Sequence, residues 1–142
     1  MTDTIERRAI VVDYTLSASP EKVWRALTEP ALLERWLMPN DITPIVGHTF
    51  TFRTAPAPGF DGIVHCRVEE AQAPERLVYS WRGGPIDTIV TWTLLRTDAG
   101  GTHLRLVQDG FGPDDGFTYD ILSKGWREKA DGSLERVSCT LA

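Results

Sequence analysis

The sequence has little cysteine, no excess of positive charge and no long apolar segment. Its 142 residues include only two cysteines, Cys66 and Cys139, which lie far apart and form no CxxC motif. Neither a disulfide framework nor a zinc knuckle is therefore expected. The three histidines are dispersed without metal-ligand spacing, so we predict no metal site and no cofactor.

Charge and hydropathy exclude further classes of protein. Fifteen Lys and Arg residues against 20 Asp and Glu residues give a net charge of −5 and a pI near 5.1. Nucleic-acid binding and polybasic membrane binding both need a basic surface, which is missing here. No apolar run approaches the roughly 20 residues of a spanning helix, and the N-terminus lacks the order of regions typical of a signal peptide. We expect a cytoplasmic protein with neither nucleic-acid nor membrane partners.

Apolar and polar residues alternate along six segments, which predicts six β-strands. The segments are residues 9–17, 48–53, 63–71, 76–82, 87–96 and 102–108. Short connections rich in Gly, Pro and Asp separate the last five, so these strands should pair with antiparallel neighbours. The composition does not shift along the chain, and a chain of this length can bury a sizeable core. We therefore expect a single domain over residues 1–142, with residues 1–8 flexible.

Helical patterns occur in two places. After the first strand, Ser19 is suited to be an N-cap and Pro20 to be the first helical residue, and Pro30 ends this helix and begins a second short one. From about residue 114 to residue 141, apolar residues recur every three or four positions, which predicts one long C-terminal helix. A helix broken into two pieces at Asp131-Gly132-Ser133 is the alternative, because glycine lowers helix stability.

This order of elements predicts an α+β fold of the helix-grip (START-like) type. A curved antiparallel sheet of six to seven strands would wrap around the long C-terminal helix, the only element large enough to cover one sheet face. Two short helices between strands one and two would close one end of the sheet. A gap between the sheet and the helix would be filled either by side chains or by a ligand.

Ring side chains gather on the sheet face that the long helix should cover, and they form either the wall of a ligand pocket or a packed core. Gln108 shares the inward parity of Leu104 and Leu106, and a buried amide needs partners that a ligand could supply. The candidate ligand-binding residues are Trp36, Phe50, Phe52, Cys66, Tyr79, Trp81, Trp92, Gln108, Phe117, Leu122 and Trp126.

Signals for catalysis are weak. The candidates for acid–base chemistry are His65, Asp87 and Asp109. His65 shares a strand face with Arg67 and Glu69, opposite the apolar face, and a solvated ladder of charges is the alternative interpretation. No GxSxG elbow, no Ser/His/Asp set and no phosphate-cradling glycine loop is present. We assign no catalytic residue. A cyclase, dehydratase or hydrolase activity is kept as an alternative hypothesis for the function.

Several short motifs occur together in a specific order and spacing. They are SPEKVWRALT at 19–28, Glu34-Arg35-Trp36 followed by Pro39, Val46-Gly47, Pro74-Glu75-Arg76-Leu77 with Trp81, Gly101-Thr102, Gln108-Asp109-Gly110-Phe111 and Gly125-Trp126. Over about residues 9–130 the chain resembles the family named after the activator of heat-shock protein 90 ATPase. That family lies within the START-like, birch-pollen-allergen-like (SRPBCC) superfamily. The Gly-Ser interruption of the last helix departs from the family pattern.

The resemblance implies a START-like domain that holds a small apolar molecule, such as a lipid, plant hormone or polyketide, in the central gap. It also implies, as an alternative, a stress-response protein that stimulates the heat-shock protein 90 ATPase, with the chaperone as partner. Candidate residues for that contact are Arg7, Arg8, Arg127, Glu128 and Lys129. The name-giving co-chaperones carry a further N-terminal domain, for which this chain is too short. The ligand, and the choice between monomer and homodimer, are left open.

Overall fold

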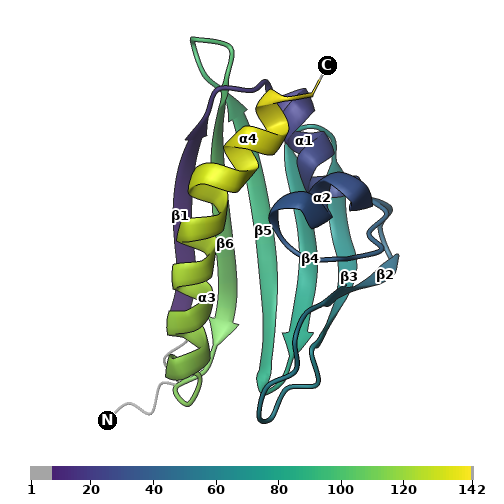
Figure 1. The fold of residues 1–142 in the computed structure, drawn as a ribbon, viewed down its shortest axis with the longest axis vertical. Coiled ribbons are helices and arrows are strands. Elements are labelled where there is room, and N and C mark those ends of the chain that lie inside the picture. Colours follow the sequence, from purple (N-terminus) through teal and green to yellow (C-terminus); the bar gives the residue numbers. More distant parts are fainter. Residues whose placement is uncertain (1–7, 142) are drawn as a thin grey trace.

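A curved antiparallel sheet and a long C-terminal helix form the framework of the protein (Figure 1). The computed structural model describes residues 8–141, apart from the side chains of residues 8 and 129–131. Within this range the sheet has six strands in the order β1-β6-β5-β4-β3-β2. They are β1 (Arg8–Leu16), β2 (Thr49–Arg53), β3 (Ile63–Gln72), β4 (Arg76–Gly83), β5 (Ile86–Arg96) and β6 (Thr102–Phe111). The predicted helix-grip fold is thereby confirmed.

Two short helices, α1 (Pro20–Thr28) and α2 (Pro30–Trp36), follow β1 and cover one end of the sheet (Figure 1). Both helices begin at the prolines predicted from the sequence. The Ser19 side chain accepts a hydrogen bond from the backbone N–H of Lys22 (3.4 Å), and a proline begins each helix. The Trp36 indole donates to the carbonyl of Ala26 (2.8 Å), which ties α2 to α1.

The C-terminal helix is continuous but not uniform. It consists of α3 (Gly116–Lys129), a π-helical turn η1 (Ala130–Leu134) and α4 (Glu135–Cys139). The chain stays helical at Gly132-Ser133, but its turns widen there. A π-turn accommodates an extra residue without ending the helix. None of the helices in residues 8–141 has the length and hydropathy needed to cross a bilayer.

The last strand extends three residues beyond its predicted end at Gln108. Gly110 makes this possible because its φ of +114° suits glycine, and a Cβ there would lie 3.2 Å from the Asp87 carbonyl oxygen. The register between β1 and β6 shifts at the same place, as in a β-bulge. The predicted flexible residues 1–7 lie outside the described residues, and residue 8 begins β1.

The end of the C-terminal helix is anchored to the end of β1. Leu134, Val137 and Ser138 are buried. The Glu135 carboxylate accepts hydrogen bonds from the backbone N–H and the hydroxyl of Ser17 (3.0 and 2.9 Å) and from the Cys139 thiol (3.1 Å). Burial opposes ionisation of this carboxyl, but the hydrogen bonds from Cys139 and Ser17 outweigh it and lower the pKa of Glu135.

This anchor predicts a pH-dependent contribution to stability. We expect Glu135→Ala to lower the free energy of unfolding by about 1 kcal/mol at neutral pH, a value reduced for solvent screening. Because the folded pKa lies below the unfolded one, the contribution is complete above the unfolded pKa and disappears as the pH falls through the folded pKa. Urea unfolding at pH values from neutral to strongly acidic measures it. Glu128→Ala, which removes an exposed carboxylate of α3, is the control and should change little.

Candidate functional site

Seven aromatic side chains, five from the sheet, one from α2 and one from α3, form one continuous cluster on the inner side of the sheet. Neighbouring ring centroids lie 5.2–6.2 Å apart, and most pairs meet edge to face. None of the seven is more than 3% exposed. We call this set the ring cluster; its members are Trp36, Phe50, Phe52, Tyr79, Trp81, Trp92 and Trp126.

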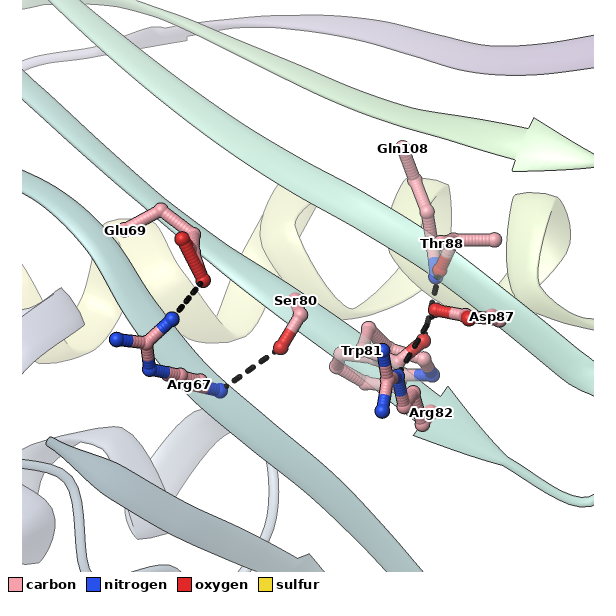
Figure 2. A network of polar contacts seen from close by, with 8 residues as sticks. All are labelled: Arg67, Glu69, Ser80, Trp81, Arg82, Asp87, Thr88 and Gln108. Atoms are coloured by element: carbon pink, nitrogen blue, oxygen red, sulfur yellow. Dashed lines mark hydrogen bonds and ion pairs between the residues drawn. The ribbon is translucent and has the colours of Figure 1, made fainter. Parts of the chain in front are cut away.

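A chain of buried hydrogen bonds runs from α3 into the sheet. The Trp126 indole donates to Gln108 Oε1 (2.8 Å), Gln108 Nε2 donates to Thr88 Oγ1 (3.0 Å), and Thr88 Oγ1 donates to the Trp81 carbonyl (3.1 Å). An indole N–H can only donate, so Gln108 must turn its oxygen toward Trp126. Figure 2 shows Thr88 linking Gln108 to Trp81. The inward parity predicted for Gln108 is therefore correct, and its side chain is fully buried.

A second buried contact lies beside this chain of hydrogen bonds. The Trp92 indole donates to the hydroxyl oxygen of Tyr79 (3.0 Å), and burial raises the pKa of that phenol. Tyr79 and Gln108 lie in one row across three strands, since Tyr79 pairs with Val90 and Val90 pairs with Gln108.

Two polar hydrogens in this row have no hydrogen-bond acceptor among the described residues. Among the described residues, neither the Tyr79 hydroxyl hydrogen nor the second hydrogen of Gln108 Nε2 has an acceptor. Every buried side-chain nitrogen and oxygen in that part of the chain nevertheless has at least one partner. The row therefore offers two donors without leaving any buried polar atom wholly unpaired.

Side chains fill the space between the sheet and the helix in the described part of the structure. Cys66, which pairs with Trp81 across β3 and β4, is 4% exposed, and it is the most exposed inward-facing member of the predicted set on the sheet. Burial, and secondarily the nearby Asp41 charge, raises the pKa of its thiol. A thiol in such surroundings is unreactive, in keeping with a packing role.

Leu122 and Phe117, two of the predicted site residues, lie on different sides of α3. Leu122 is half-buried and packs against the core. Phe117 does not join the ring cluster, because it is 80% exposed on the opposite side of the helix. Nine residues separate Phe117 from Trp126, and at 3.6 residues per turn this spacing places two side chains on opposite faces.

Two residues of the site were missed from the sequence. Thr88 receives the Gln108 amide, and Tyr14 on β1 donates to the Trp126 carbonyl (2.9 Å). Each has the same strand parity as its inward-facing apolar neighbours, which is the signal that could have identified it.

The outer face of the sheet carries a separate open hollow of about 730 Å³. His65 and Asp87, two of the acid–base candidates, line it, whereas Asp109 on β6 is exposed and outside its lining. Two ion pairs line it, Arg67 with Glu69 at 3.4 Å and Arg82 with Asp87 at 3.1 Å, as Figure 2 shows. Among residues 8–141, no group of three His, Cys, Asp or Glu side chains is placed to hold a metal.

The residues considered for a chaperone contact are only partly described. Arg127 and Glu128 are exposed on α3. Arg7 and the side chains of Arg8 and Lys129 lie outside the described residues. The chaperone partner stays a prediction.

Comparison with known families and structures identifies the relatives of this fold. The sequence model of the "Activator of Hsp90 ATPase homolog 1-like protein" family matches residues 17–137. The chain belongs to this family. The match begins at the end of β1 and extends into α4, so it includes both the ring cluster and the helix above it.

Solved structures of similar proteins share the fold of this Hsp90-activator-like chain. Protein MLL2253 from Mesorhizobium loti is 37% identical with a TM-score of 0.84, and the match covers 95% of this chain and all of that one. CalU16 from Micromonospora echinospora is 21% identical, with 94% and 83% covered and a TM-score of 0.66. DynU16, a putative protein in the dynemicin biosynthetic locus, is 24% identical, with 93% and 47% covered and a TM-score of 0.76. No curated protein matches the sequence.

The polar network of this family member predicts a large effect of one substitution. Gln108→Leu keeps the side-chain volume but leaves the Trp126 N–H without its acceptor, so we expect a loss of about 2 kcal/mol in the free energy of unfolding. Urea unfolding followed by circular dichroism measures it. Gln72→Leu, the same change at an exposed position of β3, is the control. Equal effects of the two substitutions would contradict a structural role for the network.

Proposed function

We propose that the protein binds a small, mainly apolar molecule with an acceptor oxygen, between the concave sheet face and α3. The observation that carries this proposal is the pair of buried donors, Tyr79 O–H and Gln108 Nε2–H, that each keep one hydrogen without an acceptor among the described residues. Each group already takes part in one hydrogen bond, and its remaining hydrogen is free to be donated to a further acceptor. A ligand oxygen would satisfy either hydrogen.

The surroundings of these donors match the chemistry of a ligand site. Such sites are lined mainly by apolar and aromatic side chains, with a few placed polar groups that orient the ligand. The ring cluster would supply the apolar wall, and Tyr79 and Gln108 the polar groups. Members of the SRPBCC superfamily, which this chain resembles, hold apolar molecules in the corresponding gap. This analogy of fold supports the proposal without identifying the ligand.

Binding at this place requires movement. The ring cluster fills the gap, so side chains must shift before a ligand can occupy it. The apparent affinity is then the intrinsic affinity multiplied by the fraction of molecules that are open. We therefore expect weak to moderate affinity for simple probes.

A pair of matched probes tests the proposal. Acetylnaphthalene carries a carbonyl oxygen, and isopropenylnaphthalene has nearly the same shape with a methylene group in its place. We expect the carbonyl probe to bind about fivefold more tightly, the value of roughly one net hydrogen bond. Tyr79→Phe should reduce this preference. Calorimetric titration, supported by quenching of tryptophan fluorescence, measures both affinities.

Tyr119→Phe is the matched control for Tyr79→Phe. Tyr119 lies near the start of α3, where its hydroxyl donates to the Ala9 carbonyl (3.2 Å). Its variant should keep the preference for the carbonyl probe. If neither probe binds the wild-type protein, or if the wild-type protein binds both probes equally tightly, the proposed function is wrong.

A further inference from the structure

Trp126 is the side chain through which α3 reaches the centre of the sheet. Its indole lies between Trp81 (5.6 Å, 62°) and Trp92 (5.5 Å, 85°), and its N–H is bonded to Gln108. Among the described side chains of α3, Trp126 alone is buried. We call the space that this indole occupies, between Trp81 and Trp92, the Trp126 slot.

The helix that carries Trp126 is held unevenly. Its C-terminal extension α4 is fixed by buried side chains and by the bonds of Glu135 to Ser17. The described side chains of α3 other than Trp126 are half-buried or exposed, and two hydrogen bonds tie α3 to β1: Tyr14 to the Trp126 carbonyl and Tyr119 to the Ala9 carbonyl. The π-turn η1 lies between the two parts, and such turns are frequent sites of helix bending and function.

From this geometry we infer that Trp126 is an internal stand-in for the ligand: its indole occupies the binding slot, and a flat aromatic molecule replaces it. The inference rests on the proposed function and names the class of ligand. The indole leaves by rotation of its side chain, which does not require the Tyr14 bond to the Trp126 carbonyl to break. The incoming molecule then takes the place between Trp81 and Trp92.

The groups exposed by this exchange define the ligand further. When the indole leaves, Gln108 Oε1 loses the donor that it has among the described residues and becomes a free acceptor. The replacing molecule therefore carries an O–H or N–H group at the position of the indole N–H. A hydroxyl serves both needs, because it donates to Gln108 Oε1 and its oxygen can accept from a neighbouring donor.

The exchange also explains why the ligand must be flat. Withdrawing Trp126 loses the burial of a large ring and one buried hydrogen bond, and a ligand binds measurably only where it restores both. Edge-to-face contacts with Trp81 and Trp92 need an aromatic partner. A saturated ring system of the same skeleton is thicker and has no π-face, so it cannot make these edge-to-face contacts.

A direct test follows Trp126 in the wild-type protein. The chain has five tryptophans, so fluorotryptophan labelling gives five fluorine NMR signals, and the Trp126→Phe variant assigns the one of interest. With saturating β-naphthol we expect the Trp126 signal to become sensitive to exchange of water for heavy water, as for an exposed ring. The Trp92 signal should stay insensitive, because Trp92 remains on the sheet.

Variants and a saturated probe add an independent measurement. Trp126→Ala empties the slot, so β-naphthol should bind about tenfold more tightly than to the wild type. For decahydro-β-naphthol, the saturated analogue, Trp126→Ala should increase the affinity by a smaller factor. Trp24→Ala is the matched control, because Trp24 is a half-buried tryptophan of α1 outside the ring cluster, and it should leave the β-naphthol affinity unchanged.

The outcomes separate this inference from the proposed function. If β-naphthol binds while the Trp126 signal stays insensitive to solvent, the inference is overturned and the proposed function stands. Equal affinity for β-naphthol and its saturated analogue overturns the ligand class. If acetylnaphthalene binds but β-naphthol does not, the inference is likewise overturned. If none of these probes binds, the proposed function itself fails.

Discussion

The hydrogen bond from the Trp126 indole to Gln108 is the contact on which the interior depends. A curved sheet presents a broad concave face, and a single helix can rest on it at many rotations about its axis. A buried indole N–H and a buried amide restrict that choice, because each is costly unless it meets the other. Thr88 and the Trp81 carbonyl then complete the pairing, and the rings of the cluster pack around the position so defined.

Most of the fold could be predicted from local patterns. Alternation identified all six strands, and Ser19, Pro20 and Pro30 marked the two short helices, because these signals act over a few residues. The errors occurred where a non-local contact decides the outcome. β6 continues to Phe111 because Gly110 permits a bulge against β1. The single long C-terminal helix was predicted correctly, but not its π-turn at Gly132, where α4 beyond the turn is held by Ser17. Neither partner is visible in the local sequence.

The candidate site could be predicted in part. Strand parity placed Tyr79, Trp81 and Gln108 on the inner face, since every second residue of a strand faces the same way. Phe117 was included in the predicted set, although its spacing of nine residues from Trp126 places it on the opposite side of the helix. Whether a gap is filled depends on how side chains from different elements interlock, and composition does not determine that. The ring cluster shows a filled gap, with its polar groups directed at one another.

The first strand and the last helix of this chain are each other's partners. Tyr14 contacts Trp126 across 112 residues of sequence, and Ser17 contacts Glu135 across 118. During synthesis on the ribosome, Tyr14 of β1 is therefore made 112 residues before its partner Trp126. Long-range contacts of this kind slow folding and leave apolar surface open in the meantime. The nascent protein is thus most vulnerable to aggregation just before its final helix emerges.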